Sequence, residues 1–200
     1  MDYTNEDFFK YKKYLVSLQN LLDECFENQK EYICCHQGCS FCCEKGEYPY
    51  SELEFNYLLL GFFKIPISEQ KKVVLRIKNL KEEYTKCVDK KNFMYRCPFL
   101  NEENSCTVYE YRGLICRTFG LITELESGKY TLPFCSALGL NYSKIYNQEL
   151  WKIDYDLVKK LGYKALPNPY KLDLKRLTTV NVSKEEPLSF GKIKSLVEWL

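Results

Sequence analysis

Cysteines are the residues of this sequence whose type and spacing point most directly to chemistry. Eight of the eleven cysteines fall into two groups. The first group is a short loop that contains Cys35, Cys39, Cys42 and Cys43. The second group is spread along the chain and consists of Cys97, Cys106, Cys116 and Cys135. Gaps of two or three residues hold two sulfurs within reach of one ion, so the loop is typical of a metal site. The fold must bring the second group to the same place, which predicts a site that ties distant segments together.

Thiolates are soft ligands that select zinc, iron–sulfur clusters or copper(I) over magnesium and calcium. Four thiolates saturate one tetrahedral zinc ion or one cubane cluster, so eight candidates exceed a single saturated site. Either two centres exist, or some cysteines are buried, redox-active or outside the ligand shell. On extended backbone Cys42 and Cys43 would point apart, and Cys42 is favoured as the direct ligand because Cys39-x2-Cys42 has the usual spacing of a ligand pair. Cys34, beside Cys35, has the same ambiguity.

The first loop has a second interpretation. Cys35-x3-Cys39-x2-Cys42, with an aromatic residue before the third cysteine, has the form of a radical S-adenosylmethionine loop. That fold needs repeated βα units, and no such pattern follows. His36 is the single histidine, and an exposed place in a polar loop is favoured over metal ligation. The sequence offers no convincing acid–base pair for catalysis.

Three arginines, Arg96, Arg112 and Arg117, flank the second cysteine group. A centre with four thiolates carries net negative charge, which nearby guanidinium groups offset while they donate hydrogen bonds to sulfur. Arg112 and Arg117 are therefore candidates for this supporting role, and Arg117 is favoured because it directly follows Cys116. The alternative for these arginines is a surface ion pair, with Glu110 for instance.

Composition narrows the classes of function. The chain has 200 residues, 46% of them hydrophobic, and a formal net charge of +2 without a long basic block. The charge itself argues neither for nor against nucleic acid, but the interspersed acidic and basic residues favour a solvated surface, and we expect no nucleic-acid partner. The first residues lack the basic and apolar regions of a signal peptide, and the longest apolar run, 57–63, is too short to span a membrane. We therefore expect a cytoplasmic protein in which thiols stay reduced, which favours metal ligation over disulfides.

The elements around the cysteines are predicted mainly as helices. Apolar residues at gaps of three and four predict a helix over 4–30, with Cys25 in its core face. Ser51-x-x-Glu54 is a capping box that starts a second helix, to about Phe62. A third helix is predicted over 68–90, and its inward residues are predicted to be Val74, Ile77, Leu80, Tyr84 and Val88.

The second half of the chain is predicted to be less regular. Residues 126–129 predict a β-hairpin turn within 117–134. Residues 142–161 have helical spacing, 166–187 are irregular, and 192–200 predict a last amphipathic helix. The fold class is thus mainly α with a small β-hairpin, with helices around an irregular cysteine-ligated metal site. We expect a cysteine-cluster domain with its N-terminal helix over 1–141 and a helical extension packed on it over 142–200.

These motifs together resemble a known family. The first loop, then Cys97-Pro-Phe-Leu, then Cys106-Thr-Val-Tyr-Glu-Tyr-Arg112, then Cys116-Arg117, resemble the CxxCxxCC, or YkgJ-type, cysteine-cluster family over about 35–119. Cys135 fits a later cysteine of many members, and Ser51-x-x-Glu54 resembles the helix start after the first loop. Gly113 departs from the family pattern, which often has proline there, and the first gap is three residues rather than two.

The resemblance implies a zinc or iron–sulfur centre held by the eight cysteines. The surplus of thiols and the flanking arginines make an iron–sulfur cluster the first choice and zinc the second. One branch of the family resembles the flagellin lysine N-methylases, which implies S-adenosylmethionine as a further cofactor candidate and a protein as substrate. Metal binding is therefore the predicted function and lysine N-methyl transfer the alternative, with enzymatic activity and oligomeric state left open.

Overall fold

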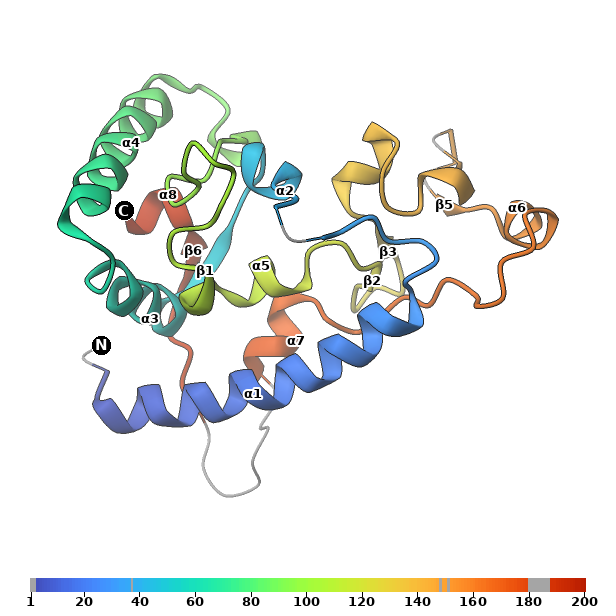
Figure 1. The fold of residues 1–200 in the computed structure, drawn as a ribbon, viewed down its shortest axis with the longest axis horizontal. Helices are drawn as coiled ribbons and strands as arrows, with labels where there is room; N and C mark the ends of the chain where they lie inside the picture. Colours follow the sequence, from blue (N-terminus) through green and yellow to red (C-terminus); the bar gives the residue numbers. More distant parts are fainter. Residues whose placement is uncertain (1–2, 37, 148, 151, 180–187) are drawn as a thin grey trace. The chain divides into compact units, whose positions relative to one another are not determined.

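The computed structural model describes residues 3–36, 38–147, 149–150, 152–179 and 188–200 (Figure 1). It is mainly helical, with small two-stranded antiparallel sheets, as predicted. Of the described residues, 3–12, 38–117 and 188–200 form a first compact unit, and 13–36 and those within 118–179 form a second. Within these ranges, no helix combines the length and apolar character needed to cross a bilayer.

The predicted N-terminal helix is confirmed as α1 (Asn5–Asn28). Its first residues belong to the first unit, where the ring of Tyr11 packs edge-on against Tyr57 with centroids 5.1 Å apart. Its later residues belong to the second unit, where the Tyr14 hydroxyl donates to the Leu177 carbonyl over 2.7 Å. Cys25 is 3% exposed, which confirms its place in the core face.

The first unit is built around one strand pair and the helices attached to it. Strand β1 (Pro49–Ser51) pairs antiparallel with β6 (Ile193–Ser195), and α8 (Leu196–Trp199) follows β6 (Figure 1). Helix α3 (Glu52–Phe62) starts directly after β1 with the predicted capping box. The prediction of one helix over 192–200 was wrong for its first half, because pairing with β1 satisfies the backbone groups of β6.

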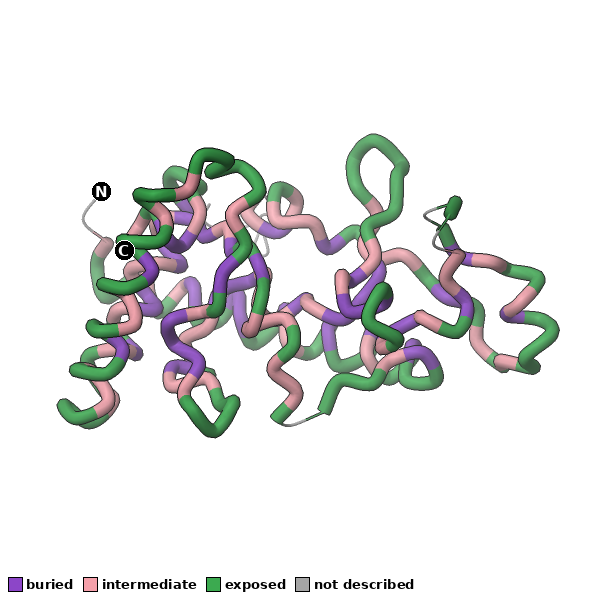
Figure 2. The backbone as a smooth tube through the Cα atoms, turned by 90° about the horizontal axis from the view of Figure 1, so that it is seen from above, coloured by how far each residue is buried: buried purple, intermediate pink, exposed green. Residues whose placement is uncertain are grey.

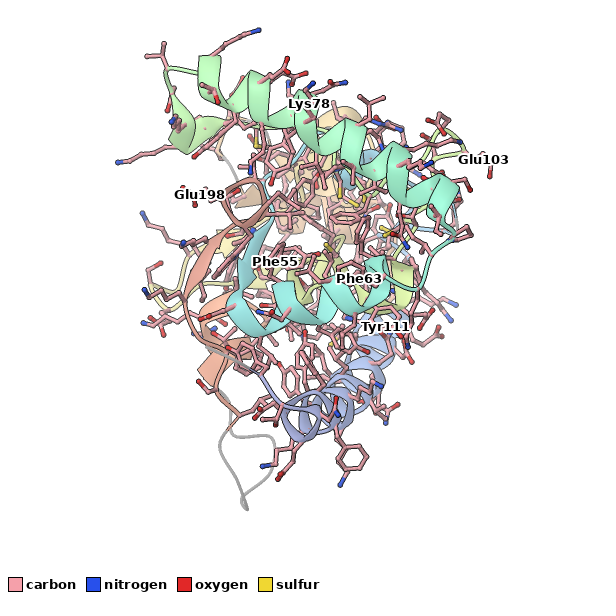
Figure 3. All side chains as sticks on the ribbon, turned by 90° about the vertical axis from the view of Figure 1, so that its left-hand side faces the viewer. Phe55, Phe63, Lys78, Glu103, Tyr111 and Glu198 are labelled. Atoms are coloured by element: carbon pink, nitrogen blue, oxygen red, sulfur yellow. The ribbon has the colours of Figure 1, made fainter. Side chains whose placement is uncertain are left out.

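Helix α4 (Ile67–Lys86) buries Leu80 as predicted, but its inward face differs from the predicted one at Val74 and Val88. Val73 and Leu80, seven residues apart, are buried, whereas Val74 is 55% exposed. Val88 lies beyond the end of the helix and is fully exposed. Because valines are adjacent at 73 and 74, the sequence did not show which of them faces inward, and in the folded chain Val73 is the buried one. The Tyr84 hydroxyl donates to Glu198 of α8, which Figure 3 labels near α4.

Short elements complete the first unit. They are α2 (Phe41–Glu44), η1 (Lys90–Asn92), η2 (Tyr109–Tyr111) and α5 (Leu114–Thr118). Figure 3 shows Tyr111 beside α3, where Gly61 leaves room for its ring: a Cβ at Gly61 would lie 2.5 Å from the Tyr111 Cγ.

The second unit contains the predicted hairpin, in which β2 (Thr123–Glu124) pairs with β3 (Tyr130–Thr131). Its other elements are η3 (Phe134–Leu138), η4 (Ser143–Ile145), β4 (Tyr146–Asn147), β5 (Lys152–Ile153), α6 (Tyr155–Lys160) and α7 (Leu174–Thr179). Helix α6 confirms the later part of the helical prediction over 142–161, whereas the β4–β5 pair shows that it was wrong for the earlier part.

The physical reason is the core of the second unit, in which Ile145, Ile153 and Val158 pack with Tyr32 and Tyr142. A bent chain brings these side chains together more effectively than one straight helix. Figure 2 shows the buried residues of this unit in purple. The predicted irregular segment 166–187 includes α7, and its residues 180–187 lie outside the described part of the chain.

Candidate metal centre

The first unit contains six of the eight predicted ligands. These are Cys39, Cys42, Cys43, Cys97, Cys106 and Cys116. Five of them, Cys42, Cys43, Cys97, Cys106 and Cys116, are called the thiol cluster below. They come from three places along the chain: the short helix α2, the loop from 97 to 106, and helix α5. The first unit therefore brings cysteines of both sequence groups together.

Cys42 and Cys43 lie on helix α2, which forms because Ser40 offers its carbonyl oxygen to the N–H groups of Cys43 and Glu44. Successive helical side chains are about 100° apart rather than opposite. The two sulfurs are 3.9 Å apart. The prediction that these sulfurs diverge assumed extended backbone and was wrong. Sulfurs about 2.3 Å from a tetrahedral zinc ion are about 3.8 Å from each other, so this pair already has ligand spacing.

Backbone pairing brings Cys97 to this helix. Gly46 and Tyr95 exchange two hydrogen bonds of 3.1 Å, and the Cys97 N–H then donates to the Cys43 carbonyl over 2.8 Å. Gly46 is required at this crossing, because a Cβ there would lie 3.0 Å from the Cys42 carbonyl oxygen and from the Tyr48 ring. Two segments some fifty residues apart are therefore joined by main-chain bonds at the thiols.

Cys106 closes the loop that starts at Cys97. It forms an isolated bridge with Leu100, and the next N–H, of Thr107, donates to the Phe99 carbonyl over 2.9 Å. Asn101 holds the tip of this loop, since its side-chain oxygen accepts the N–H groups of Glu103 and Ser105. The loop is thus fixed by hydrogen bonds of its own.

Cys116 is placed by two buried residues of β1 and α3. The Tyr50 hydroxyl oxygen lies 3.4 Å from the Cys116 sulfur and accepts the N–H of Gly113 over 3.0 Å. The Glu54 carboxylate accepts the Leu114 N–H over 2.7 Å with one oxygen and the Ser51 hydroxyl over 2.6 Å with the other. These hydrogen bonds therefore attach the start of α5 to residues 50–54, which include the predicted capping box.

Burial and mutual charge act on the cluster thiols. Burial is the largest cause that raises the pKa of Cys97, Cys106 and Cys116, the last to about 12. Neighbouring thiolates raise these pKa values further: Cys116 acts on Cys97, Cys42 acts on Cys106, and Cys106 acts on Cys116. The thiols therefore lie near one another, and a bound cation would favour their ionised forms, as the Tyr50 hydrogen bond already does for Cys116.

Cys42 and Cys43 affect each other's pKa through the hydrogen bond between their thiols. Their hydrogen bond is the largest cause that raises the pKa of Cys43, ahead of burial and of the charges of Cys42, Cys116 and Cys97. The same bond lowers the pKa of Cys42. One of these two thiols therefore gives up its proton more readily than the other.

The predicted arginines have distinct positions. Arg112 stacks on the Tyr109 ring at 3.6 Å, and its charge lowers the pKa of Cys106 against the larger effect of burial. Arg117 donates to the backbone carbonyl oxygens of Arg112 and Glu110. Arg96 forms an ion pair with Glu44, which directly follows Cys43. Of the three, Arg112 has the clearest electrostatic effect on a thiol.

Cys35 and Cys135 belong to the second unit. The buried Asn141 side chain donates to the Cys35 sulfur over 3.1 Å and to the Gly120 carbonyl over 3.0 Å, and it accepts the Cys34 N–H over 2.7 Å. Gly120 has φ +103°, and a Cβ there would lie 2.7 Å from the Cys35 sulfur.

Cys135 is buried on η3 of the same unit. Burial is the main cause of the raised pKa of Tyr142, and the charges of Cys35 and Cys135 add to it, so both thiols lie near this ring. His36 is exposed, with Nδ1 2.9 Å from the Cys34 carbonyl oxygen. Cys39 is half-buried in the first unit, just before α2.

The donor set of the thiol cluster fits zinc and iron, which prefer soft sulfur ligands. In the described part of the chain, no three His, Cys, Asp or Glu side chains are already placed to hold a metal ion. Cys42 and Cys43 have the spacing of a ligand pair, so a metal held by three or more thiols would require others of the cluster to move toward this pair. The fit of the thiol cluster to a metal therefore rests on its sulfur donors and on the spacing of the Cys42–Cys43 pair.

Sequence reasoning missed two residues of the site, Tyr50 and Glu54. The signal for Glu54 was present, since Ser51-x-x-Glu54 predicted a helix cap, but its second oxygen reaches Leu114 only in the folded chain. Tyr50 directly precedes this motif and is one of many tyrosines, so nothing in the sequence distinguishes it. Asn141, which contacts Cys35 in the second unit, is likewise not distinguished by anything in the sequence.

These observations define a mainly helical protein with a cluster of half-buried cysteines from both cysteine groups. The chain belongs to the CxxCxxCC family, described as "Putative zinc- or iron-chelating domain", whose profile matches residues 34–136. The matched range includes all eight predicted ligands. No curated protein and no solved structure matches the chain significantly.

Proposed function

We propose that this chain is a metal-binding protein whose thiol cluster holds an iron–sulfur cluster or a zinc ion. The observation that carries the proposal is the geometry of the cluster, in which the sulfurs of Cys42 and Cys43 lie 3.9 Å apart and the Cys97 N–H donates to the Cys43 carbonyl over 2.8 Å. The family description, zinc or iron chelation, agrees with the same chemistry. A bound metal would cross-link α2, the 97–106 loop and α5, and an iron–sulfur cluster would also supply one-electron chemistry.

An iron–sulfur cluster remains our first choice. The thiol cluster contains five cysteines, one more than either a tetrahedral zinc ion or a cubane cluster accepts, so the preference rests on charge rather than on this count. The Arg112 charge near Cys106 offsets part of the negative charge that thiolates and sulfide would share. Ligation by Cys35, Cys39 and Cys135 stays a prediction, as do the relation to flagellin lysine N-methylases and the use of S-adenosylmethionine.

The test compares two matched variants of the anaerobically purified protein. Cys97 belongs to the thiol cluster, whereas Cys87, in the same unit, ends α4 and donates its thiol to the Asp89 carbonyl. We expect iron and acid-labile sulfide in equal amounts in the wild type and in Cys87→Ser, and a loss of both in Cys97→Ser. Stoichiometric zinc in a colourless protein would make zinc the first choice and an iron–sulfur cluster the second. Equal metal content in both variants, or no metal in the wild type after reconstitution, would overturn the proposal.

A further inference from the structure

The Tyr50 hydroxyl is in contact with the Cys116 sulfur in the interior of the first unit. The two atoms are 3.4 Å apart, and Tyr50 is 2% exposed. Its strand, β1, is held by pairing with β6, in which Tyr50 lies opposite Lys194. The Trp199 indole N–H also donates to the Tyr50 carbonyl over 2.9 Å. The strand pairing and the Trp199 hydrogen bond thus hold the backbone of Tyr50, which fixes the position of its ring.

The hydrogen-bond partners of the Tyr50 hydroxyl determine whether it donates to the Cys116 sulfur or accepts from it. The hydroxyl oxygen accepts the Gly113 N–H over 3.0 Å, so one lone pair is used. A thiolate bound to a metal has no proton to give. Once Cys116 binds a metal, only the Tyr50 hydroxyl can donate in this pair.

The fit between Tyr50 and Gly113 is specific to glycine. A Cβ at position 113 would lie 2.6 Å from the Tyr50 Cζ and 3.0 Å from the Glu54 Oε1. A proline there would also lack the N–H that Tyr50 accepts. The residue that departs from the common family pattern is therefore the one that lets Tyr50 reach the sulfur.

We propose that Tyr50 is a positioning residue of the metal centre, and that its hydroxyl donates a hydrogen bond to the metal-bound sulfur of Cys116. This inference rests on the proposed metal-binding function. A hydrogen bond to a thiolate withdraws electron density from sulfur and fixes the orientation of the ligand, and both effects tune a metal site. Such supporting contacts typically change metal affinity about 10- to 100-fold.

The test uses cobalt(II) as a spectroscopic probe in Tyr50→Phe and in a control, Tyr95→Phe. Tyr95 is a buried tyrosine of the same unit whose hydroxyl accepts the Val197 N–H over 3.1 Å and contacts the Ser195 hydroxyl rather than a thiol. The control therefore removes a similarly bonded hydroxyl without touching sulfur. We expect the sulfur-to-cobalt charge-transfer bands of Tyr50→Phe to move to longer wavelength, with about tenfold weaker cobalt binding. The bands of Tyr95→Phe should match those of the wild type.

The outcomes separate this inference from the proposed function. A wild-type protein that shows no charge-transfer bands with cobalt and holds neither iron nor zinc after reconstitution would overturn metal binding itself. Wild-type bands that are unchanged in Tyr50→Phe would overturn the role of Tyr50 alone. If Tyr50→Phe does not fold, NMR of the wild type loaded with the spin-active cadmium isotope gives the answer. A Tyr50 hydroxyl proton coupled to cadmium supports the hydrogen bond, and a hydroxyl resonance without this coupling overturns it.

Discussion

The backbone N–H of Cys97 donates to the carbonyl oxygen of Cys43 over 2.8 Å. This bond joins the two cysteine groups through the main chain, next to the thiols themselves. The paired segments are continued by the hydrogen bonds between Gly46 and Tyr95. The fold therefore brings segments of both cysteine groups together, with one thiol pair, Cys42 and Cys43, already at the spacing of metal ligands.

Metal removal should lower thermal stability without complete unfolding. A ligand present at 100 times its Kd stabilises the folded state by about 2.7 kcal/mol, which corresponds to about 5–10 °C in Tm for a chain of this size. Circular dichroism melts with and without a chelator measure this shift. Cys97→Ser should show no shift with chelator. An equal shift in that variant would show that the metal binds elsewhere.

Gly61→Ala should destabilise the protein, although alanine normally favours a helix by about 1 kcal/mol over glycine. The added Cβ on α3 would lie 2.5 Å from the Tyr111 Cγ, so the ring must move. We expect a loss of about 1–3 kcal/mol in the free energy of unfolding, measured by urea denaturation.

Tyr111→Ala provides the control for this clash. In the Tyr111→Ala background the space beside Gly61 is open, so the same Gly61→Ala change should be neutral or stabilising. Additive effects of the two substitutions would show that the ring is not the cause.

Glu54→Gln should change how stability depends on pH. Burial raises the pKa of Glu54 above its ordinary value of 4.5, against the hydrogen bonds from Ser51 and Leu114. The folded state therefore retains this proton to higher pH than the unfolded state. The contribution of Glu54 to stability is full below pH 4.5 and is lost as pH rises through the folded pKa.

The glutamine variant has no proton to lose at this position. Its free energy of unfolding, relative to the wild type, should therefore rise with pH above about 4.5 and then level off. Denaturant titrations over a pH series measure this difference, with Glu82→Gln on the exposed side of α4 as control. A difference that falls with rising pH would contradict the buried, proton-retaining carboxyl.

Two positions of α4 test its observed inward face. Leu80 is 5% exposed, so Leu80→Ala should cost about 2–5 kcal/mol of stability. Val74 is 55% exposed, and Val74→Ala should change stability by no more than about 0.5 kcal/mol. Urea denaturation of both variants is the measurement. A large loss for Val74→Ala would restore the face predicted from the sequence.

Local signals in the sequence predicted several elements well. The gaps of three and four residues gave α1, the Ser51-x-x-Glu54 box gave the start of α3, and residues 126–129 gave the β2–β3 turn. Each of these depends on interactions within a few residues. The phase of α4, the strand β6 and the β4–β5 pair were not predicted, because each depends on a partner distant in the chain.

The sequence by itself determined the chemistry: soft sulfur donors in two groups, and the family to which the chain belongs. Only the tertiary structure decided which thiols share a buried site and which residues support them. The sulfurs of Cys42 and Cys43 lie 3.9 Å apart because Ser40 starts a helix there, and Tyr50 reaches Cys116 because Gly113 leaves space. Residue type fixes what a side chain can bind, whereas distance and burial arise from packing between segments that the sequence does not place together.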